Sequence, residues 1–464
     1  MPCSLKLGSQ IPNLRGMSTR GIVQLYSITN KWIVLCTTPH TSRQNHSLLM
    51  TQYRALSTNN IEVITAPAQT LVESVYIIDP SRIVRAVLHD TPDSPISQKN
   101  VLQIISSLSG NYRPEIQGIG NQPVNPDCPD TGKLVGSYVL GDPMNVDPYL
   151  NNFVIYAFAL IQPDGTLVPY SERHLQQLAN LRFANPDLEV IMAIGGWGND
   201  GFSDAALTPR SRYDFAREVK SWVDKYSLDG VDIDWEYPGS SAAGIKSRPE
   251  DRENFTLLLQ ALRDVLGPDA WLSVAGIGDN SYIQNVDIAA IASIIDYFNL
   301  MSYDFTAGAT GPEGARHHSN LFNSDLAYNN ISTDLYVQNL IDAGMPPEKI
   351  LMGIGFYGRN GATFTQTFDQ IRKSYLNKNG YTVRWDNVAK APYIVDRYGN
   401  FFLSFDNALS IYFKGQYVFD NCLAGMFGWQ AGMDQANILI NNMYLAMNDP
   451  KELEDILANA YYGR

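Results

Sequence analysis

Three acidic side chains alternate with apolar ones in the segment Asp229–Pro238, which reads DGVDIDWEYP. Residues two apart in a strand point to the same face, so Asp232, Asp234 and Glu236 share one face. Three carboxyl groups this close cannot all ionise when buried, so a proton is shared and at least one pKa is raised. A carboxyl group that stays protonated near neutral pH can act as a general acid.

Two other interpretations of this segment are disfavoured. A solvated acidic face would not alternate with Val, Ile and Trp. Three carboxylates could bind magnesium or calcium, but the glycine and distal glutamate of a calcium-binding loop are missing from their fixed positions. We therefore expect acid–base chemistry here, with no metal and no cofactor.

The elements that must position these carboxyl groups are eight short apolar segments that alternate with helical stretches. Each is apolar enough to be buried on both faces, which predicts a parallel (β/α)8 TIM barrel. Glu236 would lie at the C-terminal end of its strand, where the active sites of such barrels occur. The expected strands are Leu134–Leu140, Asn152–Leu160, Glu189–Gly195, Gly230–Glu236, Trp271–Ile277, Tyr297–Tyr303, Ile350–Phe356 and Leu423–Trp429.

The interval between the seventh and eighth strands is too long for one helix. Residues 361–406 contain the strand-like pieces YTVRW, PYIV and FFLSF. They predict a small α+β insertion on the rim of the barrel that deepens a cleft.

Residues 1–110 are expected to form a separate small α/β domain, and residues 131–464 the barrel domain. Between them, residues 111–130 are rich in Pro, Gly, Asn and Asp, which is typical of a linker. The N-terminal expectation rests on strands at Lys31–Cys36, Val75–Ile78 and Ile83–Leu88 and on helices at His46–Leu56 and Lys99–Leu108.

Composition limits the class of protein. With 45% hydrophobic residues, the chain of 464 residues can build a large core. Its net charge of -13 argues against a nucleic acid or an anionic membrane as partner. The four scattered cysteines exclude a disulfide scaffold and make a zinc ribbon improbable. No Sec-type signal peptide and no run of about 18 apolar residues is evident.

The acidic segment resembles the D-x-x-D-x-D-x-E signature of glycoside hydrolase family 18, the chitinases. Four further segments agree with the family in order: AIGGW at Ala193–Trp197, NLMSYD at Asn299–Asp304, GFYGR at Gly355–Arg359 and MFGW at Met426–Trp429. The resemblance covers about residues 131–447.

This resemblance implies hydrolysis of β-1,4-linked N-acetylglucosamine with retention, through an oxazolinium ion formed by the substrate's own acetamido group. Glu236 would protonate the glycosidic oxygen and later activate water. Asp234 would hold the N-acetyl group and share a proton with Asp232, and Tyr303 would fix the acetamido carbonyl. Trp429 would be the floor under the reacting sugar, and Trp197 would stack a sugar on the leaving-group side. The cleft would also be lined by Met301, Asp304, Arg359 and Phe158, the last of which could equally be core packing.

The chain departs from the family pattern at two positions. Ser137 follows Gly136 where many chitinases have Tyr, and Ala193 stands where they have Ser. In the family, these two hydroxyls hydrogen-bond the first aspartate of the acidic face, here Asp232. We expect either Ser137 or a water molecule to supply a donor instead, which leaves the pH dependence of activity open.

The resemblance leaves two alternatives to a chitinase. One is an endo-β-N-acetylglucosaminidase acting on N-glycans or peptidoglycan. The other is a chitin-binding adaptor whose N-terminal domain docks a protein partner; the retained Glu236, Asp234 and Tyr303 argue against it. Chitin is extracellular, so without a Sec-type signal we expect another export route or export within a complex.

Residues 8–110 weakly resemble a peroxiredoxin or another thioredoxin-fold domain. The resemblance rests on WIVLCTTP, a helix, and then YIIDPSRIVRAVL. The expected threonine position is Arg43 and the thiol position is His46, so the nucleophilic sulfur is missing. We therefore expect a degenerate, non-catalytic scaffold.

Overall fold

The computed structural model describes residues 132–459, Cys128 and the strands of the first 88 residues. The chain divides into two compact units, one of residues 1–122 with 449–464 and one of residues 123–448. Each unit is described by itself.

Within residues 132–459, eight parallel strands form a closed barrel in the order β10-β11-β12-β13-β14-β20-β7-β8, and β8 pairs again with β10. The predicted barrel is therefore confirmed. Its strands are β7 (Leu134–Leu140), β8 (Phe153–Ile161), β10 (Glu189–Gly195), β11 (Gly230–Asp234), β12 (Trp271–Gly276), β13 (Tyr297–Leu300), β14 (Ile350–Gly355) and β20 (Gly425–Trp429). The short β9 (Leu167–Pro169) extends β8 as an antiparallel hairpin.

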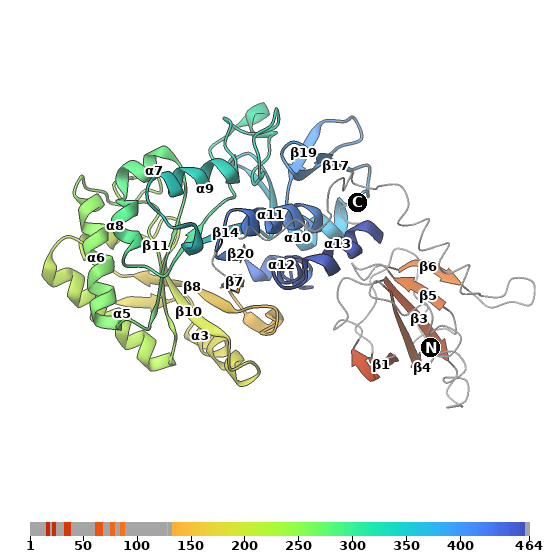
Figure 1. Cartoon of the computed structure of the whole chain (residues 1–464), viewed down its shortest axis with the longest axis horizontal. Coiled ribbons are helices and arrows are strands. Elements are labelled where there is room, and N and C mark those ends of the chain that lie inside the picture. The colour runs from red at the N-terminus through yellow and green to blue at the C-terminus, as the bar shows by residue number, and fades with distance from the viewer. Residues whose placement is uncertain are drawn as a thin grey trace, which may run out of the picture. The chain divides into compact units, whose positions relative to one another are not determined.

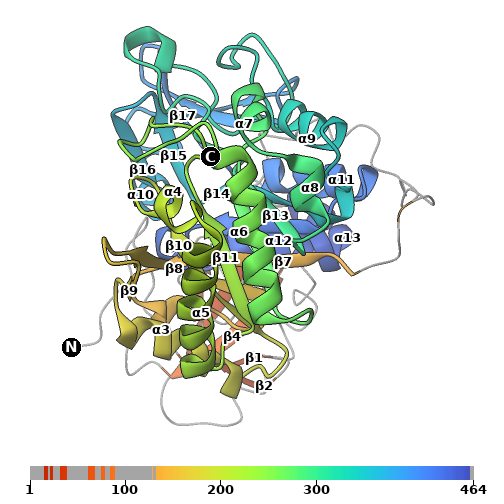
Figure 2. The same ribbon diagram turned by 90° about the vertical axis from the view of Figure 1, so that its left-hand side faces the viewer.

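Helices surround these strands, with α5, α6 and α8 on one side and α11 and α12 on the other (Figure 1). Figure 2 shows α5 and α6 in front of β11. Among the described helices, none is long and apolar enough to cross a membrane. Outside residues 357–404, the described α-helices of the barrel unit are α3 (Glu172–Ala179), α4 (Phe202–Ala205), α5 (Pro209–Tyr226), α6 (Asp251–Leu266), α7 (Asn280–Asn285), α8 (Ile288–Ala292), α9 (Thr333–Asp342), α11 (Ala408–Asp420) and α12 (Ile438–Asn448).

The connection between β7 and β8 differs from the expected alternation of strands and helices. In the fully described stretch between them, the chain forms only the 3-10 helix η3 (Pro143–Asn145). The helix α12, which follows β20, packs against β7 instead. An apolar strand can therefore be covered by a helix from another part of the chain.

The apolar face of β11 points toward the surrounding helices. Trp235, directly after the strand, stacks on Phe202 with ring centroids 5.4 Å apart and meets Phe255 edge to face at 5.5 Å. This outward packing turns the acidic residues of the same strand toward the barrel interior.

Between β14 and β20, where the sequence predicts a rim insertion, the chain forms a second sheet. Its strands lie in the order β16-β15-β19-β18-β17, and their described pairings are antiparallel. The ion pair between Lys414 on α11 and Asp406, which lies just after β19, is fully buried, with 2.8 Å between Nζ and Oδ1. The elements are β15 (Tyr357–Asn360), β16 (Phe364–Thr367), α10 (Phe368–Ser374), β17 (Thr382–Asp386), β18 (Ala391–Val395) and β19 (Phe401–Ser404).

A disulfide bond joins Cys128 and Cys422, whose Cα atoms are 5.2 Å apart although 294 residues separate them in the chain. The expectation that the cysteines form no disulfide scaffold misses this bond. Cys128 precedes β7 and Cys422 precedes β20, and closure of the barrel pairs these two strands. Sequence spacing alone carries no trace of that neighbourhood.

In the first unit, six described strands form one sheet in the order β2-β1-β4-β3-β5-β6. Strands β3 and β4 are parallel, and the other described pairs are antiparallel. Several expected features lie outside the described residues. They are the helices His46–Leu56 and Lys99–Leu108, the residues Arg43 and His46, and nearly all of the linker. The elements are β1 (Arg15–Ser18), β2 (Gly21–Gln24), β3 (Trp32–Thr38), β4 (Ile61–Pro67), β5 (Val75–Ile78), β6 (Val84–Leu88) and α13 (Pro450–Asn459).

Candidate active site

The acidic face of β11 points into the barrel. Asp232 is fully buried and Asp234 is 4% exposed. Glu236 lies two residues beyond the end of β11, at the C-terminal mouth of the barrel. The three carboxyl groups therefore follow one another toward the mouth of the barrel, Asp232 and Asp234 on β11 and Glu236 just beyond its end.

Asp232 forms hydrogen bonds with three side chains from three other strands. Its Oδ2 accepts from the Tyr138 hydroxyl at 2.7 Å, and its Oδ1 accepts from the Ser273 hydroxyl at 2.7 Å and from the Asn299 amide at 3.0 Å. Asp232 lies between two register partners, Ala193 on β10 and Ser273 on β12. The hydroxyl that Ala193 lacks is therefore supplied by Ser273 from the opposite neighbouring strand.

The expectation that Ser137 donates to Asp232 is wrong. The Ser137 hydroxyl donates to the side chain of Asn151 at 2.9 Å. Successive residues of a strand face opposite ways, so Tyr138 faces inward and Ser137 faces outward. Compared with the family pattern, the tyrosine stands one position later in the sequence, and its hydroxyl donates to Asp232.

Burial is the main cause of the raised pKa values in this cluster. It raises the pKa of Asp232 to about 6, although the hydrogen bonds from Ser273, Tyr138 and Asn299 work against it. Burial, together with the charges of Glu236 and Asp232, raises the pKa of Asp234 well above its usual range. Both shifts favour a proton on the Asp232–Asp234 pair, as expected for two buried carboxyl groups this close together.

The pKa of Glu236 is raised into the range that suits a general acid near neutral pH. Burial raises its pKa to about 7, a hydrogen bond with Tyr237 opposes the shift, and the charge of Asp304 adds to it. Burial also raises the pKa of Tyr303 well above its usual range, so the hydroxyl of Tyr303 stays protonated and able to donate.

A cavity of about 600 Å³ opens at the mouth of the barrel, above the acidic face. Of the predicted site residues, only Asp232 does not line it, because Asp232 lies deeper in the barrel. The predicted residues in the cavity wall are Phe158, Trp197, Asp234, Glu236, Met301, Tyr303, Asp304, Arg359 and Trp429.

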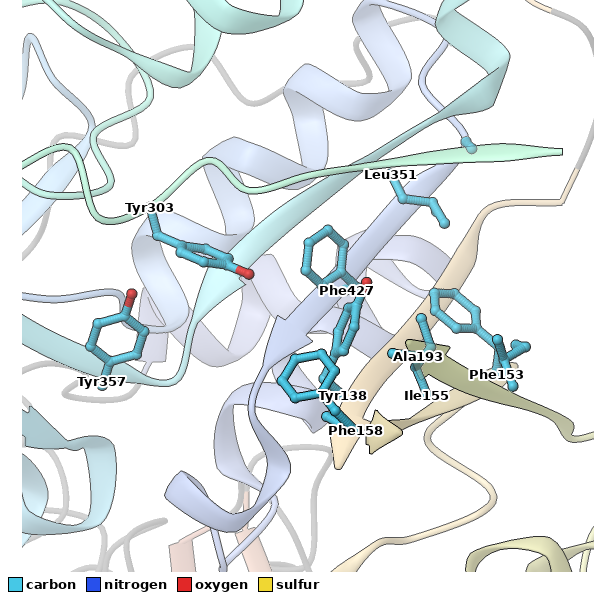
Figure 3. Close-up of a cluster of buried hydrophobic side chains, with 12 residues drawn as sticks. Tyr138, Phe153, Ile155, Phe158, Ala193, Tyr303, Leu351, Tyr357 and Phe427 are labelled. Carbon is cyan, nitrogen blue, oxygen red and sulfur yellow. The ribbon is translucent and has the colours of Figure 1, made fainter. Parts of the chain in front are cut away.

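Aromatic rings form part of the cavity wall. Trp429 stacks on Phe158 with centroids 5.7 Å apart and an interplanar angle of 30°. Figure 3 shows Tyr138 and Phe158 beside Phe427, and the ring of Tyr303 meets that of Phe427 edge to face with centroids 6.3 Å apart. Trp197, by contrast, is 63% exposed. Phe158 is buried in the core cluster and also lines the cavity, so both expected roles apply to it.

Asp304 is held by two side chains of β15, a strand of the second sheet. The Tyr357 hydroxyl donates to its Oδ1 at 2.5 Å, and Arg359 Nε lies 2.6 Å from the same oxygen. Asp304 itself has a left-handed backbone with φ of 64°. Strand β15 of the second sheet thus helps to position a residue that raises the pKa of Glu236.

Sequence reasoning missed four residues that position the site, namely Tyr138, Ser273, Asn299 and Tyr357. A signal was available for two of them. Ser273 and Asn299 are polar residues at buried positions of apolar strands, which calls for a partner inside the barrel. In the described part of the chain, no cluster of three or more His, Cys, Asp or Glu could hold a metal ion.

Removing the Tyr138 hydroxyl tests the buried network. Tyr138→Phe leaves Asp232 with one donor fewer, which costs the folded state about 1.5–3 kcal/mol when the carboxylate is charged. Asp232 is charged above its pKa of about 6, so the loss of melting temperature relative to wild type should be larger at pH 8 than at pH 4.5.

Tyr156→Phe is a matched control, because among the described residues the Tyr156 hydroxyl bonds only backbone groups of Ser171. Its loss of melting temperature should be the same at both pH values. An equal loss at both pH values in Tyr138→Phe would show that the hydroxyl does not stabilise a charged Asp232.

Comparisons with known proteins agree on the barrel unit. The family model described as "Glycosyl hydrolases family 18" matches residues 134–434. The chitinase domain of the spore coat protein CotE from Clostridium difficile is 58% identical, with a TM-score of 0.55 over 72% of this chain and 97% of that domain. A family 18 N-acetylglucosaminidase from Paenibacillus barengoltzii is 32% identical, with a TM-score of 0.62 over 68% of this chain and 99% of that one.

Among curated proteins, Chitinase A1 of Niallia circulans is 33% identical over 314 residues. The match spans 58% of this chain but only 44% of that relative. These matches leave the peroxiredoxin or thioredoxin-fold resemblance of the N-terminal residues, and the protein partner expected there, without support.

Proposed function

The chain belongs to glycosyl hydrolase family 18, and on this premise we propose that it is a chitinase that hydrolyses β-1,4 linkages between N-acetylglucosamine units. The observation that carries the proposal is the acidic face of β11 at the base of an aromatic cavity. It ends in Glu236, a carboxyl group whose pKa of about 7 suits proton donation near neutral pH. The chitinases among the similar proteins support the choice of substrate.

Glu236 donates its proton to the glycosidic oxygen as the bond from that oxygen to C1 breaks. The acetamido carbonyl oxygen of the same sugar attacks C1, which gives an oxazolinium ion and releases the leaving chain as an alcohol. Glu236, now a carboxylate, takes a proton from water, and the resulting nucleophile opens the ring at C1. Two displacements at C1 give net retention.

Asp234 holds the acetamido group during this attack. Its Oδ1 is buried and accepts no hydrogen bond from the described residues, so it is free to accept the acetamido N–H. The Asp232–Asp234 pair retains one proton, and its negative charge stabilises the positive oxazolinium ring. The Tyr303 hydroxyl, kept protonated by burial, donates to the acetamido carbonyl.

A comparison of substrates tests the proposal. We expect the purified protein to release the fluorophore from a chitotriose-type fluorogenic glycoside and to leave an N-glycan and peptidoglycan intact. If the protein cleaves only the N-glycan or only peptidoglycan, its activity is that of an endo-β-N-acetylglucosaminidase and not of a chitinase. Tight binding of chitotriose without cleavage of any substrate by the folded protein would instead indicate a chitin-binding protein.

A further inference from the structure

Asp304, whose charge raises the pKa of Glu236, has a backbone conformation that needs support from its surroundings. Its backbone is left-handed, with φ of 64°, which is uncommon for a residue other than glycine. Such a conformation persists only where neighbouring contacts hold it. Strand β15 holds the side chain of Asp304, so its backbone needs a contact of its own.

His318 supplies that backbone contact. The Asp304 N–H donates to His318 Nδ1, and the two nitrogen atoms are 3.4 Å apart. The N–H of the next residue, Phe305, donates to the His318 carbonyl oxygen at 3.1 Å. The left-handed residue and its neighbour are therefore tied to both the side chain and the main chain of His318.

His318 is itself fixed in the interior of the barrel unit. It is fully buried, and its own N–H donates to Ser404 Oγ at 3.2 Å. Its ring lies against that of Tyr357, with centroids 5.1 Å apart, and Tyr357 donates to the Asp304 carboxylate. A Cβ atom added to Gly355 would lie only 3.3 Å from the His318 ring, so the ring is closely packed. His318 therefore supports the backbone of Asp304 directly and its side chain through Tyr357.

The contact requires a neutral imidazole ring, because Nδ1 can accept the Asp304 N–H only while it carries no proton. Burial lowers the pKa of His318 to about 3, and the charge of Asp304 opposes this shift. Glu236, by comparison, changes its charge near its pKa of about 7. The ring therefore stays neutral where Glu236 titrates. The other charged or titratable groups that face the ring lower its pKa further or stay uncharged, and they are Arg359 and Tyr357 on β15, Lys414 on α11 and the adjacent His317.

We propose that His318 is a positioning residue for the general acid, because its neutral ring holds Asp304 in place and so keeps the Asp304 carboxylate facing Glu236. This rests on the proposed function, in which Glu236 is the proton donor. In this role His318 touches no substrate and acts only through Asp304. The other titratable groups that face Glu236 are Asp234, Tyr237, Tyr282 and Tyr303.

The pH dependence of kcat/KM in two variants of His318 tests the proposal. His318→Leu removes the acceptor, so Asp304 is released and its negative charge no longer favours the proton on Glu236. The pKa of Glu236 then falls, and the pH at which kcat/KM declines should move down by about 0.5–1 unit. His318→Asn offers an oxygen near the place of Nδ1 and should keep the wild-type profile. An unchanged decline in His318→Leu, or an equal shift in both variants, overturns the proposal.

Two further measurements separate positioning from general destabilisation. Tyr417→Phe is the matched control, because the Tyr417 hydroxyl bonds Asp334 and Gln338 and the residue is not among those that line the cavity. It should lower the melting temperature and leave the pH of the decline unchanged. In an Asp304→Asn background, His318→Leu should cause no further shift, because the charge that it positions is already gone. A further shift as large as in the wild-type background contradicts the proposal.

An infrared titration distinguishes a failure of this proposal from a failure of the proposed function. The difference between the spectra of wild type and Glu236→Gln isolates the carboxyl band of Glu236, and its loss with rising pH reports the pKa without any substrate. The same difference in the His318→Leu background should show that loss at lower pH, even if the protein cleaves no chitin. Identical titrations in the two backgrounds would rule out the positioning role.

Discussion

Glu236→Gln is expected to lower kcat on chito-oligosaccharides by about 10²–10⁴-fold, the usual contribution of a general acid. The amide keeps the size of the side chain but cannot give a proton to the glycosidic oxygen. The loss should be smaller on a chitotriose glycoside with a dinitrophenolate leaving group, which departs without protonation. Initial rates of both substrates at several pH values provide the measurement.

The pH profile carries a second signature of the same residue. The acid must be protonated to act, so wild-type kcat/KM should fall as pH rises through the Glu236 pKa of about 7. The residual activity of Glu236→Gln should not show this fall with rising pH. Glu253→Gln, an exposed position on α6, is the matched control and should keep wild-type rates. A Glu236→Gln protein with wild-type rates would remove Glu236 from the mechanism.

Asp234→Asn is expected to lower kcat by about 10²–10³-fold, the size of effect seen when one preorganised electrostatic partner of a transition state is lost. Asparagine can still contact the acetamido group through its oxygen, but it brings no share of the negative charge that stabilises the oxazolinium ion. The loss should therefore fall on kcat more than on KM. Steady-state kinetics on the chitotriose-type glycoside measure both constants.

Changing the substrate isolates the role of Asp234. A glycoside whose reacting sugar carries a free amine in place of the acetamide cannot form the oxazolinium ion, so the wild-type protein should cleave it poorly. On that substrate, Asp234→Asn should cost little more, because both changes remove the same interaction. Fully additive losses would mean that Asp234 acts elsewhere than on the acetamido group. The exposed Asp187→Asn serves as a neutral control.

The local patterns that predicted the barrel lie within single strands. The alternation around Asp232, Asp234 and Glu236 needs only eight residues of sequence, because a strand turns every second side chain to the same face. Likewise, apolar runs bounded by helical stretches indicated the parallel strands. The family motifs at Ala193–Trp197 and Met426–Trp429 added residues at strand ends, which line the cavity.

The side chains that contact Asp232 could not be predicted from local sequence. Tyr138, Ser273 and Asn299 are 94, 41 and 67 residues away from it in the chain. The closed barrel and the register of its strands bring them together, and a shift of one residue turns a side chain to the opposite face. This is why the expected donor, Ser137, points away.

The disulfide bond and the contact between the rings of Phe158 and Tyr170 depend on the fold in the same way. Cys128 and Cys422 meet because β7 and β20 pair when the barrel closes. Tyr170 joins Phe158 because β9 folds back on β8. The carboxyl groups and the strand that carries them could be predicted from local sequence alone. Their pKa values and partners were decided by burial and strand neighbours, which arise only when distant segments pack together.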